Sequence, residues 1–147
     1  MATNPVSLQS ARGNAAVRMA DGLLRALGGV PISLRLPTPI ATPGTSGELG
    51  LSAPIFQDVS LEPVMVRDLS AAKQQKFELL ISASAVSQQV ELQNADSADA
   101  LFALALGFVH GDDLLQIESV AADEFAGTPY LYRVIASNSQ SEIQPPA

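Results

Sequence analysis

The stretch ARGNAAVRMADGLLRALGGVPISLRL, residues 11–36, contains a helix pattern followed directly by a strand pattern. Over residues 11–27 apolar side chains recur at intervals of three and four, which is typical of one face of an amphipathic helix. Gly28 supplies a stop, and Pro31 prevents the helix from continuing. Over residues 32–36 apolar and polar side chains alternate, so we predict that the helix leads directly into a strand with one buried face.

Further strand patterns follow along the chain. The clearest is KFELLISASAV, residues 76–86, in which apolar side chains occupy alternate positions. Residues 55–69 also alternate, although Pro63 cannot donate a hydrogen bond to a sheet and indicates an edge strand or a break at that point. Residues 86–94 either extend the clearest strand or form its hairpin partner. The last strands are predicted over residues 114–121 and 130–137, after a turn at Gly111, Asp112 and Asp113.

A short internal helix is predicted between these strands. Asp96, Ser97 and Asp99 have the short oxygen-bearing side chains that begin helices. The nearly all-apolar segment ALFALALGF follows, and Gly107 ends the helix. Such an apolar helix must be buried within the fold or between subunits.

These elements predict a mainly β (α+β) chain with a single domain over residues 11–137. The expected architecture is a small antiparallel β-barrel or sandwich with an N-terminal amphipathic helix, a short internal helix and a long Pro/Gly-rich loop. That loop covers residues 37–54, which hold four prolines and three glycines. Residues 1–10 and 138–147 are expected to be a flexible N-terminus and a flexible C-terminal tail.

The composition is poor in charge for its hydrophobic content. Hydrophobic residues make up 47% of the chain and charged residues 16%, against about 25% charged in typical soluble domains. Two explanations stay open at this point. The chain is either an alanine-rich sequence with a good core, or a protein whose outer surface is largely covered by neighbouring subunits.

The charge is distributed unevenly along the chain. Residues 1–36 hold four arginines and one acid, a net charge of +3, whereas residues 37–147 hold four basic and fourteen acidic residues, a net charge of −10. The acidic excess argues against a nucleic-acid binder that grips phosphates. The uneven distribution favours either a head-to-tail contact between copies or docking of the basic end on an acidic partner. The alternative is that the arginines of the helix are merely solvated.

No pattern for catalysis, cofactor binding or metal binding stands out. The chain has no cysteine, and its one histidine, His110, is expected on a turn or the surface because it has no sequence partner for metal binding or nucleophilic catalysis. A hydrolase using paired carboxylates stays open, but nothing selects a pair. We therefore predict that the chain is not an enzyme and has no cofactor. No segment has the ~20 apolar residues that cross a bilayer, and no export signal is evident, so no membrane partner is expected.

The layout of the chain resembles that of the head-closure (head-tail connector) proteins of long-tailed bacteriophages. The similarity covers most of residues 14–137: a helix leading into VPISLRLP, a long Pro/Gly loop, the strand KFELLISASAV, and the closing pair GDDLLQIESV and GTPYLYRVIAS. The resemblance implies a small β-barrel that forms a ring beneath the portal, retains packaged DNA and presents a platform to the tail. The internal segment SADALFALALG departs from the simpler barrels of that kind.

The resemblance also implies partners, a location and site residues. The partners are further copies of the chain in a ring of six or twelve, a portal or adaptor protein above, a tail protein below, and DNA that passes through without sequence recognition. The location is the virion neck between capsid and tail, after assembly in the host cytoplasm. The candidate docking residues on the first helix are Arg12, Arg18 and Arg25. The candidate channel or inter-subunit loop residues are Pro37, Pro39, Pro43, Gly44, Gly47, Glu48 and Gly50.

Two other functions stay open on the sequence alone. One is a tail terminator or another tail protein, because such a ring needs the same self-association. The other is a non-viral acidic module that binds a protein partner. Ring formation by the purified protein separates the viral functions from the non-viral one.

Overall fold

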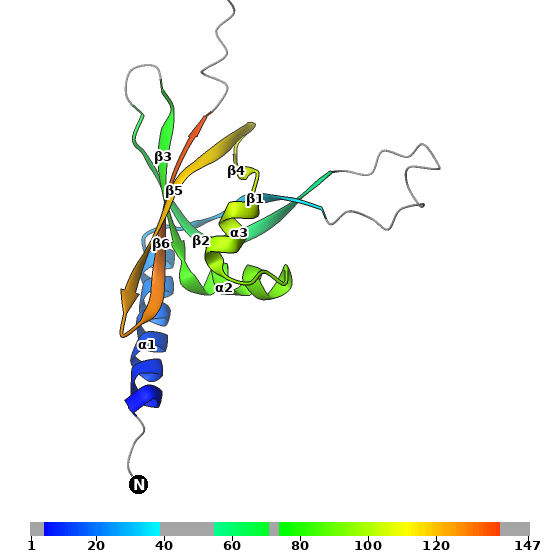
Figure 1. Ribbon diagram of the computed structural model, residues 1–147. Helices are drawn as coiled ribbons and strands as arrows, with labels where there is room; N and C mark the ends of the chain where they lie inside the picture. Colours follow the sequence, from blue (N-terminus) through cyan, green and yellow to red (C-terminus); the bar gives the residue numbers. More distant parts are fainter. Residues whose placement is uncertain (1–4, 39–54, 71–73, 139–147) are drawn as a thin grey trace, which may run out of the picture.

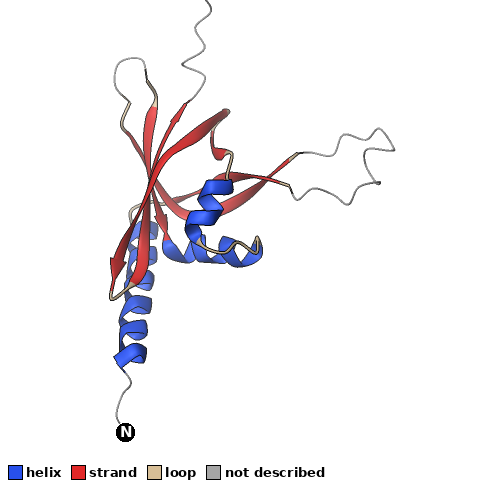
Figure 2. Cartoon of the chain, in the orientation of Figure 1, coloured by secondary structure: helices blue, strands red, loops and turns tan. Residues whose placement is uncertain are grey.

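The computed structural model describes residues 5–38, 55–70 and 74–138, and of residues 5–10 it describes the backbone alone. Within these ranges the chain forms three helices and six strands (Figures 1 and 2). In chain order they are α1 (Pro5–Ala26), β1 (Val30–Pro37), β2 (Phe56–Asp68), β3 (Lys76–Ser82), α2 (Ala83–Leu92), α3 (Ala98–Leu104), β4 (Gly107–His110), β5 (Asp113–Phe125) and β6 (Thr128–Asn138).

The six strands close into an antiparallel barrel with the order β1-β2-β3-β6-β5-β4. The short strand β4 completes the closure, because it pairs with β1 on one side and with β5 on the other. The prediction of a mainly β fold with an N-terminal helix is thereby confirmed, and of the two predicted architectures the chain adopts the barrel. Helix α1 runs beside the β5–β6 hairpin and extends past its tip (Figure 1).

The inside of the barrel is filled by side chains. Alternate residues of each strand point inward, which is the period that the sequence pattern predicted. Phe102 of α3 enters this core, with its ring centroid 6.3 Å from that of Phe108 and 5.8 Å from that of Tyr132. The completely buried residues include Leu34, Leu61, Val64, Leu79, Ile81, Leu101, Phe108, Leu115, Val134 and Ala136. The barrel is therefore a packed core rather than a channel.

The predicted strand over residues 76–86 is wrong in its last part. Strand β3 ends at Ser82, and the next residues form helix α2, so the strand or hairpin partner predicted over residues 86–94 is also wrong. The Ser82 side chain begins the helix by accepting a hydrogen bond from the Ser84 backbone N–H. Alternating alanine and serine fit either structure, whereas the Gln, Glu and Leu that follow favour a helix.

Pro63 does not break β2, contrary to the expectation from its sequence. Val30 pairs with Val64 and Ile32 pairs with Leu61, so β2 has one residue more than β1 between these two pairs. Pro63 lies in this bulge, where a strand tolerates a residue without a backbone donor.

Other boundaries differ from the sequence pattern by a few residues. Helix α1 begins at Pro5, six residues before the predicted start, and proline is favoured at the first position of a helix. Helix α3 ends at Leu104, and Gly107 opens β4, a strand that the apolar run concealed.

Candidate functional site

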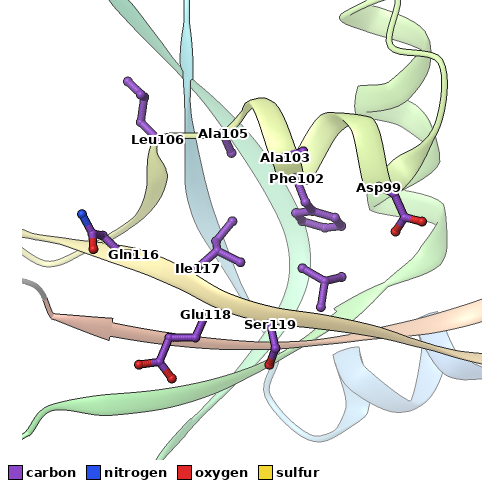
Figure 3. A pocket seen from close by; sticks show the side chains of 10 residues that line it. Asp99, Phe102, Ala103, Ala105, Leu106, Gln116, Ile117, Glu118 and Ser119 are labelled. Atoms are coloured by element: carbon purple, nitrogen blue, oxygen red, sulfur yellow. The ribbon is translucent and has the colours of Figure 1, made fainter.

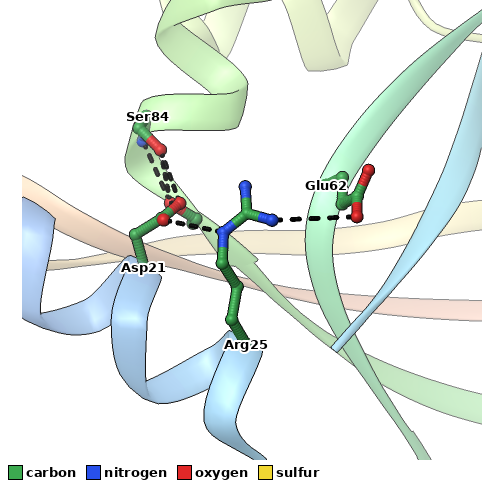
Figure 4. A network of polar contacts seen from close by, with 5 residues as sticks. Asp21, Arg25, Glu62 and Ser84 are labelled. Carbon is green, nitrogen blue, oxygen red and sulfur yellow. Dashed lines mark hydrogen bonds and ion pairs between the residues drawn. The ribbon is translucent and has the colours of Figure 1, made fainter. Parts of the chain in front are cut away.

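Helix α1 is attached to the barrel by a polar network around Asp21 (Figure 4). One carboxylate oxygen of Asp21 accepts hydrogen bonds from Ser82 Oγ at 3.0 Å and Ser84 Oγ at 2.9 Å. The other accepts from Arg25 Nε at 3.0 Å. The Arg25 guanidinium also lies 3.8 Å from Glu62 Oε1 on β2. The network therefore joins α1 to the β3–α2 junction and to β2.

The pKa of Asp21 reports how well this network holds the charged form. Burial acts to raise that pKa, but the hydrogen bonds from Arg25, Ser84 and Ser82 together outweigh it, and the pKa lies below its ordinary value. The carboxylate is therefore charged and fully engaged at neutral pH, which fixes the direction in which α1 leaves the barrel.

A glycine lets α1 approach the β5–β6 turn. A Cβ atom placed on Gly13 would lie 2.2 Å from Oγ1 and 2.5 Å from Cβ of Thr128. Residues 5–12 continue beyond this contact, and at ~1.5 Å per residue they extend the helix by about 12 Å past the turn. The N-terminal part of α1 therefore projects from the domain (Figure 1).

Gly13→Ala should lower the free energy of unfolding by up to about 2 kcal/mol. Overpacking against Thr128 costs roughly 1–3 kcal/mol, and the ~1 kcal/mol that alanine gains over glycine in a helix offsets part of this cost. Gly22→Ala is the matched control, because a Cβ atom placed there would have nothing within 4 Å and only the gain applies. Urea unfolding measures both. Equal stability of the two variants would show that α1 does not pack on the turn in this way.

The outward side of α1 carries an apolar stripe formed by Met19, Leu23 and Leu27. Their exposed fractions are 74%, 60% and 60%, and the spacing of four residues places them on one side of the helix. Val30, just after the helix, is 50% exposed. A contiguous exposed apolar patch of this kind marks a surface for another molecule more often than it occurs by chance.

The three candidate docking arginines have different surroundings. Arg25 is held by Asp21 and Glu62, as described above. Arg12 and Arg18 are exposed, and neither forms an ion pair with any residue in the described part of the chain. Arg12 is seven residues before Met19, about two helical turns, so it lies on the same side as the apolar stripe.

The ends of the long Pro/Gly loop are clamped together. The Arg35 guanidinium makes two hydrogen bonds to the carboxylate of Asp58, at 2.9 and 3.1 Å, and lies 3.9 Å above the ring of Phe56. The Arg35 carbonyl accepts a hydrogen bond from the Leu106 backbone N–H at 2.7 Å. This one residue thus joins β1, β2 and the segment after α3. Pro37 ends β1, and the candidate loop residues from Pro39 to Gly50 lie outside the described residues.

Acid should weaken this clamp. The hydrogen bonds from Arg35 hold the pKa of Asp58 below its ordinary value of 3.8, so the unfolded chain binds more protons than the folded one as the pH falls. The stabilisation is complete above pH ~4 and is lost as the pH falls through the lower folded-state pKa. Asp58→Asn should therefore lose less stability than the unchanged chain as the pH falls below about 4. Parallel thermal melts test this, and identical pH profiles would contradict it.

A groove lies between α3 and β5 (Figure 3). It exists because β4 covers β5 only as far as Leu115, so residues 116–120 have no strand on that side within the described chain. Its volume is about 470 Å³. Its lining is mixed. The apolar side chains come from both elements and are Phe102, Ala103, Ala105, Leu106, Ile117 and Val120; the polar ones are Asp99 at one end, Gln116, Glu118 and Ser119.

Helix α3 is covered on one side only. Leu101 and Phe102 are buried, but Leu104 is 56% exposed and Leu106 is 44% exposed. We predicted that this apolar segment is buried within the fold or between subunits. About half of its side chains are buried within the fold. The other half adds exposed apolar surface beside the groove.

Free acids lie at the groove and close to it in the chain. Asp99 lines the groove and Asp96 lies three residues before it; both are exposed, and neither forms an ion pair with other described residues. Burial raises the pKa of Tyr132, and the charges of Asp99 and Glu124 raise it further. The helical side of the barrel is therefore acidic, whereas the free basic residues of the described chain are on α1.

The sites considered for chemistry are less distinctive. His110 is exposed at the end of β4, as predicted, and its ring lies 5.0 Å from that of Phe77. Within the described ranges no three His, Cys, Asp or Glu side chains are grouped to hold a metal ion. Over the same residues, no helix has the length and apolar character needed to cross a membrane.

Sequence reasoning missed the network around Asp21 and the groove. Asp21 and Ser82 are 61 residues apart, and no local pattern connects them. Comparison with known proteins adds no relative: no family model, no curated protein and no solved structure matches the chain. Function must therefore be inferred from the fold and from the surfaces of α1 and of the α3–β5 groove.

Proposed function

We propose that this chain is a structural virion protein of a long-tailed phage, and that its copies form the neck ring that joins the portal to the tail. The observation that carries the proposal is the layout of the fold. A closed antiparallel barrel follows an amphipathic helix, and a long Pro/Gly segment enters between its first two strands. This is the layout that the resemblance to head-closure proteins implies.

The exposed surfaces of α1 and of the groove favour a protein that assembles with other subunits over one that works as a monomer. One side of α1 exposes Met19, Leu23 and Leu27, and a separate apolar groove lies beside α3. Two different exposed patches on one chain allow a heterologous contact, and such contacts close into rings when the rotation between copies permits it. This is also the explanation of the low charge content that the sequence left open.

The charge distribution suits a DNA conduit. Side chains fill the barrel, so DNA must pass through the lumen of the ring and not through any one subunit. A chain with a net charge of −7 should bind the duplex only weakly, because binding to phosphates requires basic residues that release counterions. The predicted role of residues 37–54 as a channel or inter-subunit loop remains part of this proposal, with the Arg35–Asp58 clamp as its base.

The proposed place in the virion is the neck, between a portal or adaptor protein above and a tail protein below. Native mass spectrometry and negative-stain imaging of the purified chain, together with immunogold labelling of intact particles, test it. A ring of six or twelve copies, or label at the neck, is the expected result. Label at the far end of the tail tube would instead identify another tail protein. A stable monomer absent from every particle would contradict the proposal and favour the non-viral binding module.

A further inference from the structure

The apolar stripe of α1 requires a partner with an apolar surface of its own. Met19, Leu23 and Leu27 are each more than half exposed, and they lie on the side of α1 turned away from the barrel, whereas Leu24 is buried against it. The hydrogen bonds of Asp21 hold α1 in this orientation, with the stripe directed outward. No described residue covers the stripe, so a second copy of the chain can do so.

The charges beside the stripe select an acidic partner. Arg12 and Arg18 form no ion pair in the described part of the chain, and the one acid of α1, Asp21, is already bonded to three side chains. Parallel packing of α1 against α1 of another copy would bring these arginines close to each other, and like charges repel. Antiparallel packing would separate them but would offer them no free acid, because Asp21 is engaged. The partner surface is therefore apolar and acidic, and it is not α1 itself.

The α3–β5 groove has both properties. Its lining includes the apolar side chains of Phe102 and Ile117 beside polar ones, and Leu104 and Leu106 add exposed apolar surface next to it. Asp99 lies at its end and Asp96 is close by in the chain, both without an ion pair among the described residues. Other acids lie elsewhere, among them Asp112 and Asp113 at the β4–β5 turn and Glu124 near the end of β5, but neither place lines the groove.

We propose that the outward side of α1 of one copy docks in the α3–β5 groove of the next copy. This interface rests on the proposed self-assembly and names the two surfaces that form it. The stripe and the groove are different patches, so each copy offers one of each to its neighbours and the contact propagates around a ring. Arg12, on the same side of α1 as the stripe, faces Asp96 and Asp99 across the contact, and Arg18, about 100° around the helix, adds positive charge at the edge of the contact.

Cysteine cross-linking of the full chain tests the interface cleanly, because the chain has no cysteine of its own. The test variant carries Met19→Cys on the stripe and Ala103→Cys on the exposed side of α3 at the groove. The control variant carries Met19→Cys with Ser70→Cys, an exposed residue close to Asp68 at the other end of the barrel. Both variants are oxidised at a protein concentration of about 0.5 mM and are analysed without reductant. The salt concentration is kept low, because charge attraction is then least screened.

A ladder of cross-linked copies from the Met19/Ala103 variant, absent from the control and from each single variant, is the expected result. Dimers from Met19→Cys alone would show that α1 packs against α1. A ladder from the Met19/Ser70 variant would show that α1 docks at the end of the barrel that carries Ser70 and Asp68. Either outcome overturns the proposal, as does the absence of any ladder.

The charge requirement is tested separately by Arg12→Glu combined with Arg18→Glu. Both residues are exposed, so the fold should be retained, and sedimentation should show self-association weakened at least about tenfold. Unchanged association would overturn the role of the two arginines. Rings whose Met19/Ala103 cysteines do not cross-link would reject this interface and leave the neck function standing. A ladder from a protein that is absent from phage particles would support the interface and contradict the neck function.

Discussion

Phe108→Ala is expected to lower the free energy of unfolding by about 3–5 kcal/mol, the range for removing a fully buried aromatic ring. Phe108 is 0% exposed and contacts Phe102, which connects α3 to the barrel interior. It also lies on β4, the strand that closes the barrel between β1 and β5. Its loss should therefore loosen both the core and the closure.

Phe125→Ala is the matched control for that measurement. Phe125 lies at the end of β5 and is 52% exposed, so its removal should change the stability by less than about 1 kcal/mol. Chemical denaturation of both variants gives the comparison. Similar losses for the two phenylalanines would mean that Phe108 is not a central core residue. A chain that loses Phe108 should also fail to assemble, because assembly requires the folded barrel.

Gly107→Ala should lower the free energy of unfolding by several kcal/mol. The residue has a φ of +148°, which side-chain-bearing residues rarely adopt at a cost of about 1–3 kcal/mol. A Cβ atom there would also lie 2.3 Å from the backbone oxygen of Leu115, and overpacking adds roughly 1–3 kcal/mol. The strained position and the contact both belong to the β4–β5 pairing, so the variant should lose barrel closure first.

Gly111→Ala separates the cost of the positive φ from the cost of overpacking. Gly111 also has a positive φ, of +61°, but nothing lies within 4 Å of its added Cβ. It should therefore cost only about 1–2 kcal/mol, the penalty of the left-handed conformation. Hydrogen exchange of the β4 amides gives a second reading, with faster exchange expected in Gly107→Ala. Protection equal to that of the unchanged chain would contradict this account of the closure.

The sequence patterns predicted much of the fold because they report burial. Residues 32–36 alternate since one side of β1 faces the core. The repeat over residues 11–27 reports burial only in part, because Leu24 is buried against the barrel whereas Leu23 and Leu27 are exposed. The patterns failed where two structures bury the same residues. Alanines at 83 and 85 are buried in α2 as they would be in a strand, and the apolar run around Gly107 contains the end of a helix and a strand together.

The candidate site was harder to predict because it depends on contacts between distant segments. Arg25 looks like a free docking residue in the sequence, but its charge is engaged by Asp21 and by Glu62 on β2. The groove arises from the shortness of β4, which no composition reveals. The excess of apolar over charged residues left open a good core or a surface covered by other subunits, and it could not indicate where exposed apolar side chains lie.

Because the Arg35–Asp58 clamp holds the two ends of residues 39–54 together, that segment can change in evolution independently of the barrel. Backbone pairing continues to Thr38 and Ile55, whose N–H and carbonyl are 3.2 Å apart, so the inserted segment begins and ends at adjacent points. Lengthening such an insertion twofold costs only about 0.6 kcal/mol of closure entropy. Selection can therefore shorten, lengthen or replace the segment while the barrel that carries it stays the same.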